Sequence, residues 1–345
     1  MKRIISFSLT LIMLVLLFSV FGIYAFAEEH DFCEDLSGDG LCDIKTDGIA
    51  CGMMVDGFTS LKGHSISLAE NIIIYFTVEL SEEAALSSTT SATVTLPDGS
   101  ESIIPLSKAI VTPAGFVFRA DVAAKEMTDT VTLIISYTDE YGIDYVSNEY
   151  TYSVAEYCED YLASAPTGEY AEIIGALKNY GAMAQRYFGY KTDNMITDEP
   201  DVSEVILPSQ SAVEISGAVP GISHIKASLV LESETVIRHY FVIDDGAVIS
   251  DYSFSTGTTV LEPKESGSSN SYYVDIEGIS PTELATEYTV KVTKAEESYT
   301  CSYSAIDYAV RMANKDGQSS VTVDLCKAIY AYYAAADKLA KPCKR

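Results

Sequence analysis

Hydrophobic residues occupy every second position in several stretches of the chain, which is the pattern of a β-strand with one buried face. The clearest stretch, residues 72–80, is also hydrophobic at some intervening positions, so both faces of this strand are expected to be covered. Turn sequences follow two strands: Pro97-Asp98-Gly99 predicts a turn and Asp245-Gly246 predicts a tight hairpin. Further strands are predicted at residues 91–96, 115–122, 130–138, 144–152, 225–232, 236–243, 271–277 and 287–303.

Two stretches with helical spacing follow each set of strands. Ser153 and Glu156 form the pattern of a capping box at the start of one helix, and Ser304 with Asp307 repeats it in the second half. The second helix of each pair has hydrophobic residues at alternating spacings of four and three, which place them in a stripe along one side. The stripes comprise Ile173, Leu177, Tyr180, Ala184 and Tyr187 in the first half, and Leu325, Ile329, Tyr332, Ala336 and Leu339 in the second.

The two halves of the chain match in order and spacing. Tyr152, Ser153 and Tyr157 align with Tyr303, Ser304 and Tyr308 at an offset of 151 residues, and the two stripes align at an offset of 152. Such a match predicts two copies of one module. The predicted fold is α+β, with two tandem modules that each consist of an antiparallel β-sandwich-like sheet followed by a helical hairpin. The expected segments are 1–27 (signal peptide), 28–58 (Cys/Asp-rich calcium-loop segment), 59–189 (first module), 190–210 (linker) and 211–345 (second module).

The first residues of the chain have the pattern of an export signal. Lys2 and Arg3 precede an uncharged run from Ile4 to Tyr24, and Ala25-Phe26-Ala27 supplies a small-x-small cleavage site. An uncleaved membrane anchor is the alternative, because the uncharged run approaches the length of a membrane span. We expect a protein that is secreted, or associated with the cell surface, and that has no membrane contact once the signal is cleaved.

Charge restricts the partners of the chain. It has 50 Asp and Glu residues against 22 Lys and Arg residues, a formal net charge of −28. Binding to nucleic acid requires clustered basic residues that neutralise phosphates, so a nucleic-acid partner is not expected. Anionic membrane surfaces are disfavoured for the same reason.

An acidic segment near the N-terminus carries a recognisable binding motif. Its oxygen-bearing residues follow the order of a calcium-binding loop, and Gly40 permits the sharp turn at the sixth position. Thr46 at position twelve replaces the bidentate Glu of an EF-hand, so the spacing is more similar to thrombospondin type 3 repeats or to one half of a dockerin. The expected calcium ligands are Asp35, Ser37, Asp39, the Leu41 carbonyl, Asp43 and Asp47.

Two other interpretations of this segment stay open. One is a zinc site, and the other is a disulfide-pinned acidic turn without an ion. Zinc would use His30, Cys33, Cys42 and Cys51, although this spacing matches no common zinc motif. The chain has seven cysteines, so at least one thiol is free or shared with another chain. Cys158 and Cys326 lie in helical patterns, where cysteine is typically a small buried hydrophobic residue.

Four stretches of the chain, Val122–Thr130, Leu177–Phe188, Thr192–Asn194 and the loop Gly38–Asp43, form a combination that is known from other sequences. They resemble an uncharacterised secreted module of large surface and exported proteins from anaerobic Gram-positive bacteria. The resemblance covers most of residues 30–340 and is looser in the second half. It implies an accessory role outside a bacterial cell and supplies no catalytic residues.

Motifs for catalysis are not found. The sequence lacks a G-x-S-x-G elbow, an H-E-x-x-H pair, a P-loop and a dinucleotide fingerprint. The four histidines are scattered along the chain, and His239 is interpreted as a satisfied core or surface residue of its strand. A carboxylate pair for glycoside hydrolysis arises by chance among so many acids. We therefore expect no enzyme.

Tyrosine is abundant, with 24 residues, whereas tryptophan is absent. A tyrosine combines an apolar ring with a polar tip and is suited to surface contacts. Candidate contacts are Tyr272, Tyr273, Tyr330, Tyr332 and Tyr333, although Tyr332 lies on a helical stripe and is expected to pack in the core.

The expected function is secreted or cell-surface binding or adhesion without catalysis, with an extracellular glycan or protein as ligand and a structural calcium site. The alternatives are an extracellular polysaccharide hydrolase and an accessory scaffold-docking protein.

Overall fold

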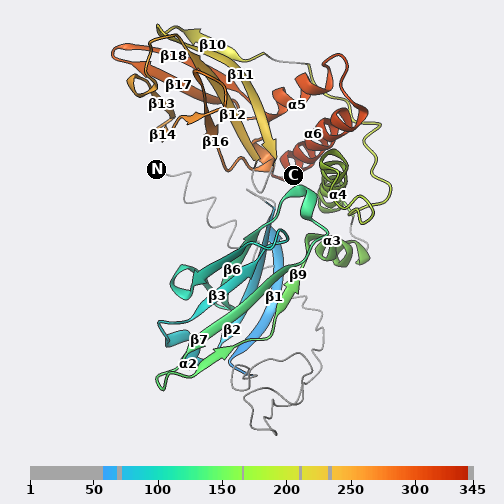
Figure 1. The fold of residues 1–345 in the computed structure, drawn as a ribbon. Coiled ribbons are helices and arrows are strands. Elements are labelled where there is room, and N and C mark those ends of the chain that lie inside the picture. Colours follow the sequence, from blue (N-terminus) through green and yellow to red (C-terminus); the bar gives the residue numbers. More distant parts are fainter. Residues whose placement is uncertain (1–56, 68–71, 165–166, 210–211, 232–234, 341–345) are drawn as a thin grey trace, which may run out of the picture. The chain divides into compact units, whose positions relative to one another are not determined.

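A computed structural model describes residues 57–67, 72–164, 167–209, 212–231 and 235–340. It is a mixed α+β structure with several antiparallel sheets and few helices, which confirms the predicted fold class (Figure 1). Contacts within the chain divide it into two compact units. The first unit comprises Met1–Ser65, described from Gly57, with Tyr75–Arg119 and Val131–Thr151; the second comprises Ile66–Ile74, Ala120–Thr130 and Tyr152–Arg345, described to Ala340.

Strands of the N-terminal half form two sheets, with the orders β1-β2-β6-β5 and β4-β3-β7-β8, and β9 also pairs with β7. Inward side chains alternate along the strands, as in β7, where Val131, Leu133 and Ile135 are fully buried. The strands are β1 (Thr59–Ser67), β2 (Ile73–Leu80), β3 (Ser91–Thr95), β4 (Glu101–Pro105), β5 (Ile110–Thr112), β6 (Gly115–Asp121), β7 (Val131–Thr138), β8 (Asp144–Val146) and β9 (Tyr150–Tyr152). The short helices are α2 (Glu82–Leu86), η1 (Leu106–Lys108) and η2 (Ala124–Glu126).

Strands of the C-terminal half form two antiparallel sheets, with the orders β11-β12-β16-β15 and β10-β18-β17-β13-β14. Their buried residues include Ile237, Phe241 and Phe254, so both sheets contribute to the core. The strands are β10 (Glu214–Gly217), β11 (Ile222–Leu231), β12 (Thr235–Ile243), β13 (Ser253–Thr256), β14 (Thr259–Leu261), β15 (Lys264–Glu265), β16 (Ser271–Ile276), β17 (Tyr288–Lys294) and β18 (Glu297–Tyr303). The 3₁₀ helices are η3 (Ile249–Asp251) and η4 (Pro281–Glu283).

The two predicted turns have different outcomes. Pro97-Asp98-Gly99 closes the β3–β4 hairpin, with the Gly99 N–H donating to the Leu96 carbonyl at 2.9 Å. Asp245-Gly246 also forms a turn, but the tight hairpin predicted there is wrong. β12 before this turn pairs with β11 and β16, whereas β13 after it lies in the other sheet. Turn residues reverse the chain locally and do not select the strand that pairs next.

The larger helices are α3 (Val154–Ala163), α4 (Glu169–Phe188), α5 (Ala305–Ala313) and α6 (Ser320–Ala340). The predicted capping box of α3 is confirmed, because the Glu156 carboxylate accepts from the Ser153 N–H at 2.7 Å and the Ser153 hydroxyl accepts from the Glu156 N–H at 3.1 Å. Ser304 caps α5 through the Asp307 N–H in the same way. Among the described residues, no helix has the length and apolar character needed to cross a membrane.

The two long helices α4 and α6 pack along each other within the second unit. Tyr180 on α4 and Tyr332 on α6 are buried, and their rings stack with centroids 5.7 Å apart and an interplanar angle of 20°. A helical hairpin was predicted after each sheet, and this arrangement of two separate modules is not confirmed. The stripes instead pack largely on each other, because two apolar helix faces can bury one another. Tyr187 is 47% exposed, so the first stripe ends before this residue.

Residues 190–210, predicted as an exposed linker, are partly attached to α4. Ile196 and Val202 are buried in this segment. Gln185 of α4 is also fully buried; its side-chain oxygen accepts from the Ile196 N–H at 3.0 Å, and its amide donates to the Asn194 carbonyl at 3.0 Å. The polar and acidic composition of the segment did not indicate this attachment, which depends on two apolar residues and one glutamine.

Candidate functional site

The predicted calcium loop lies outside the described residues. This holds for all of its expected ligands, Asp35, Ser37, Asp39, Leu41, Asp43 and Asp47. It also holds for the alternative zinc ligands His30, Cys33, Cys42 and Cys51. The candidate sites in the described part of the chain are therefore formed by other residues.

The five candidate tyrosines have different environments. Tyr332 is 2% exposed, which confirms that it packs in the core. Tyr330 and Tyr333 are half-buried on α6, with ring centroids 6.1 Å apart. Tyr272 and Tyr273 lie side by side on β16 and point to opposite faces of the sheet. Tyr273 is on the outward face.

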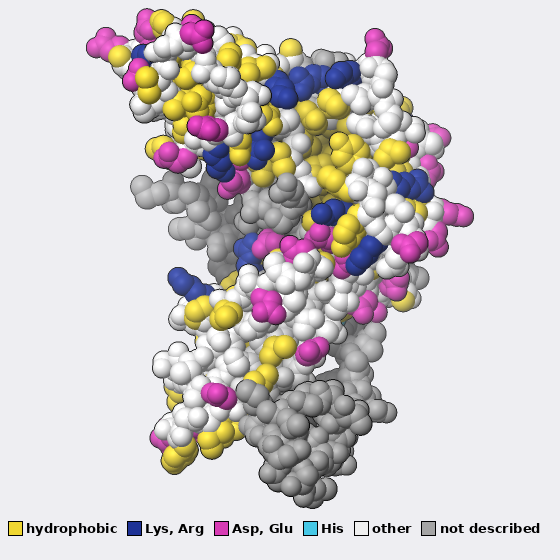
Figure 2. Space-filling view, in the orientation of Figure 1, with side chains coloured by type: hydrophobic (Ala, Val, Ile, Leu, Met, Phe, Trp, Pro, Cys, Tyr) yellow, Lys and Arg dark blue, Asp and Glu magenta, His cyan; other side chains and the backbone are white. Residues whose placement is uncertain are grey.

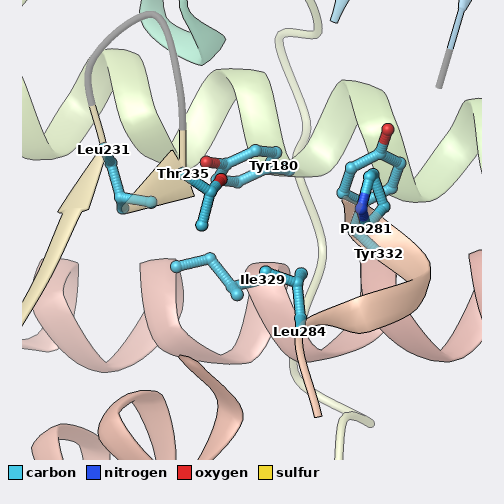
Figure 3. Close-up of a pocket in the computed structure, with 7 residues that line it drawn as sticks. All are labelled: Tyr180, Leu231, Thr235, Pro281, Leu284, Ile329 and Tyr332. Atoms are coloured by element: carbon cyan, nitrogen blue, oxygen red, sulfur yellow. The ribbon is translucent and has the colours of Figure 1, made fainter. Parts of the chain in front are cut away.

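A small cavity adjoins the stack of Tyr180 and Tyr332. Its volume is about 20 Å³, and Figure 3 shows side chains from both long helices, from β11 and β12 and from the η4 region around it. The lining residues are Tyr180, Leu231, Thr235, Pro281, Leu284, Ile329 and Tyr332. Sites for small ligands are usually larger than about 300 Å³, so this cavity is a packing defect rather than a binding site.

A row of alternating cations and rings crosses the outward face of the sheet β11-β12-β16-β15. In the strand register Lys226 lies opposite Tyr240, Tyr240 opposite Tyr273, and Tyr273 opposite Lys264. The Lys226 ammonium is 4.6 Å from the centroid of the Tyr240 ring, and the two tyrosine ring centroids are 5.9 Å apart. Strand register thus brings four residues distant in sequence into one continuous surface.

Arg238 holds the Tyr273 ring in place. Its guanidinium carbon lies 3.9 Å from the centroid of that ring, within the range of a cation–π contact. Two hydrogen bonds to the Asp275 carboxylate, at 2.7 and 3.0 Å, orient the guanidinium and raise the pKa of Arg238 further above its ordinary value. Lys264 is 3.4 Å from the same carboxylate. These contacts leave little freedom to the Tyr273 side chain.

We call Lys226, Arg238, Tyr240, Lys264 and Tyr273 the tyrosine–cation face. It carries three cations, of which Arg238 and Lys264 pair with the Asp275 carboxylate, although the whole chain has a net charge of −28. Figure 2 shows Lys and Arg side chains bordering a hydrophobic area over the part of the chain labelled β11, β12 and α5 in Figure 1. Aromatic rings can stack on sugar rings, and the cations can pair with carboxylate or sulfate groups.

A second cluster lies on the inner side of the same sheet. His224 of β11, His239 of β12 and Cys301 of β18 place their ligand atoms within 4.8 Å of one another. His224 Nε2 is 3.2 Å from His239 Nδ1, and Cys301 Sγ is 3.6 Å from the same nitrogen. His239 and Cys301 are fully buried, whereas His224 is partly exposed. In the described part of the chain, this is the one group of three or more His, Cys, Asp or Glu residues close enough to share an ion.

Burial determines the charge of this cluster. It lowers the pKa of His224 to about 4 and that of His239 to about 3, so both imidazoles are neutral near pH 7. Burial also raises the pKa of the Cys301 thiol to about 12. His239 was expected to be satisfied in its strand, and it is indeed in the core, but its Nε2 atom has no hydrogen-bond partner.

The described cysteines form no disulfide. Cys158, Cys301 and Cys326 are free and buried, and burial raises the thiol pKa of each to between about 11 and 12. The interpretation of Cys158 and Cys326 as small buried residues of helices is confirmed.

The cluster of His224, His239 and Cys301 was not predicted from the sequence. The histidines are scattered along the chain, but antiparallel pairing of β11 with β12 brings residues 224 and 239 together. Alternation along both strands contained a usable signal, since each histidine lies on the inward face. Cys301 belongs to the other sheet, and no local pattern indicated its position.

Comparison with protein families found no family that matches the chain, and comparison with curated proteins found none that is similar to it.

Proposed function

We propose that the chain is an exported, non-catalytic binding protein, and that its tyrosine–cation face binds an acidic glycan outside the cell. The observation that carries this proposal is the row formed by Lys226, Tyr240, Tyr273 and Lys264 across one sheet. Cations near the rings favour a sugar polymer with carboxylate or sulfate groups over a neutral one. The remaining surface is acidic and repels anions, so an acidic polymer is expected to contact the protein at this face.

The arrangement of the strands supports a tandem duplication, which is part of the same proposal. The sheets β1-β2-β6-β5 and β11-β12-β16-β15 have strands in corresponding order along the chain. The sheets β4-β3-β7-β8 and β14-β13-β17-β18 correspond in the same way. A 3₁₀ helix also follows the corresponding strands, η2 after β6 and η4 after β16. Two helices close each half, as the matching sequences at offsets of 151 and 152 residues predict.

Binding can be measured by calorimetry with the mature protein and three polymers. Polygalacturonate and chondroitin sulfate should bind, and neutral dextran should not. The double variant Lys226→Ala/Lys264→Ala and the variant Tyr273→Ala should each weaken binding to the acidic polymers about five- to tenfold, because each removes contacts worth about 1 kcal/mol. Raising the salt concentration should weaken binding of the wild-type protein, since exposed charges are screened.

Lys291 provides the matched control. It is an exposed lysine on β17 of the other sheet, and Lys291→Ala should leave binding unchanged. If the face variants bind acidic polymers as tightly as the wild-type protein does, the face is not the contact. Release of reducing sugar from any polymer would instead favour the alternative of a polysaccharide hydrolase.

The calcium loop is the second part of the proposal. Its six expected ligands supply only oxygen atoms, the donors that Ca²⁺ prefers. Titration of the mature protein with Ca²⁺ should show one site that Asp39→Ala abolishes, and Asp316→Ala, which changes an exposed acid elsewhere, should not affect it. Retention of the site in Asp39→Ala would contradict this assignment. Loss of partner capture in EDTA or in Asp39→Ala would favour the alternative of a scaffold-docking protein.

A further inference from the structure

The inner cluster of the C-terminal sheets has the donor set of a transition-metal site. Two imidazole nitrogens and one sulfur converge from three strands, β11, β12 and β18. Nitrogen and sulfur donors suit borderline and soft ions such as Zn²⁺ and Cu⁺, whereas Ca²⁺ requires oxygen. The cluster is therefore chemically distinct from the N-terminal calcium loop.

The distances agree with one shared ion. With metal–nitrogen bonds of about 2.05 Å and metal–sulfur bonds of about 2.3 Å, tetrahedral ligands lie about 3.3 Å (N to N) and about 3.6 Å (N to S) apart. The observed separations are 3.2 Å between His224 Nε2 and His239 Nδ1, and 3.6 Å between His239 Nδ1 and Cys301 Sγ. The third separation, between the imidazole of His224 and Cys301 Sγ, is within 4.8 Å. His224 can move closer to Cys301 because this histidine is partly exposed and adjoins a bulge in β11.

The core of the sheet does not require an imidazole at position 239. A buried Nε2 atom without a partner destabilises the fold by about 1–3 kcal/mol. If the two halves are duplicates, Ile72 corresponds to Thr235. The Ile72 carbonyl accepts a hydrogen bond from the segment before η2, and the Thr235 carbonyl accepts one from the segment before η4. Four residues further on, the first half has Phe76 and the second has His239, and both are fully buried. The phenyl ring of Phe76, which has no polar atom, thus occupies in the first half the position that the His239 imidazole occupies in the second.

We propose that His224, His239 and Cys301 bind a single Zn²⁺ or Cu⁺ ion through two imidazole nitrogens and a thiolate. Both histidines are already neutral and can donate a lone pair to the ion. The Cys301 thiol loses its proton to solvent when the metal–sulfur bond forms, because a bound cation stabilises the thiolate. The partly exposed side of His224 provides the route of entry.

Optical titration of the chelator-treated mature protein tests the proposal. Co²⁺ serves as a probe for Zn²⁺ and should produce sulfur-to-cobalt charge-transfer bands that Zn²⁺ then displaces. Cu⁺ binding is measured separately, under anaerobic conditions, by competition with a coloured chelator. Displacement of Co²⁺ by Zn²⁺ assigns zinc, and Cu⁺ binding without cobalt bands assigns copper. Binding of neither ion by the wild-type protein overturns the proposal.

Variants separate this cluster from the N-terminal cysteines. Cys301→Ala and His239→Phe should weaken binding of the assigned ion about 100-fold or more, and Phe76 indicates that the second variant folds. Cys326→Ala is the matched control, because Cys326 is a buried free cysteine on α6 and its loss should leave binding unchanged. If Cys301→Ala and His239→Phe remain folded by circular dichroism and bind the ion as the wild-type protein does, the ion lies elsewhere and the proposal is wrong.

Discussion

Replacing Gly115 with alanine should lower the free energy of unfolding of the first unit by about 3–4 kcal/mol. Gly115 begins β6 with φ of +130°, a region that residues with a side chain rarely adopt. A Cβ atom there would collide with the Val78 carbonyl oxygen of β2 and lie 2.9 Å from the carbonyl carbon. Backbone atoms inside a sheet cannot move aside without breaking neighbouring hydrogen bonds, so the strain persists. Urea unfolding followed by far-UV circular dichroism measures the loss.

Gly99→Ala separates the collision from the backbone strain. Gly99 also has a positive φ, of +81°, but an added Cβ would meet no atom within 4 Å. This variant should be destabilised by only about 1 kcal/mol, from the dihedral strain alone. Equal destabilisation by both substitutions would show that contact with Val78 does not limit the residue at position 115.

Replacing Gln185 with methionine should destabilise the second unit by about 3 kcal/mol. Methionine has a similar shape but makes none of the three hydrogen bonds of the Gln185 amide, which accepts from the Ile196 N–H and donates to the Asn194 carbonyl and, at 3.4 Å, to the Thr128 hydroxyl. The Ile196 N–H and the Asn194 carbonyl would lose their partners beside a fully buried side chain, and an unpaired buried polar group costs about 1–3 kcal/mol. Thermal or urea unfolding measures the change, and faster proteolysis after residue 190 should accompany it.

Asn179 on the same helix is a matched control for Gln185. Its amide also holds the following segment by two hydrogen bonds, donating to the Asp201 carbonyl at 3.0 Å and accepting from the Asp201 N–H at 3.2 Å. These bonds are exposed, so water replaces them in Asn179→Ala and the loss should stay below about 1 kcal/mol. A similar loss in both variants would mean that burial is not the source of the Gln185 effect.

Much of the local structure follows from the sequence pattern. Alternation predicted most of the longer strands, and the Ser153–Glu156 box predicted the start of α3 at the right residue. The nine-residue strand β1 was missed, and so were the short strands β4, β5, β10, β13, β14 and β15. β5, β14 and β15 contain too few residues for a period to show, and β4 and β10 are exposed at nearly every position, so they have no buried face to alternate. The Asp245-Gly246 turn was placed correctly but paired wrongly, since the partner of a strand is chosen by contacts across the whole sheet.

The candidate sites were less predictable. Tyr273 was identified as a candidate because tyrosine is abundant in the chain and this residue lies on a predicted strand. Lys226, Arg238 and Lys264 become its neighbours only through the register of four strands. The histidine–cysteine cluster depends in addition on which two sheets face each other. Short-range periodicity contains neither the register of distant strands nor the pairing of sheets, so the neighbours at each site could not be predicted from the sequence.

The ring stack of Tyr180 and Tyr332 has a consequence for how this polypeptide can be dissected. Because α4 and α6 bury each other's apolar side, producing the two helices on separate polypeptides would expose these sides to solvent. Separately expressed halves would therefore have exposed apolar surfaces that contain tyrosine, and they would tend to self-associate. Biochemical work on either half alone would then report on an aggregate rather than on the native molecule.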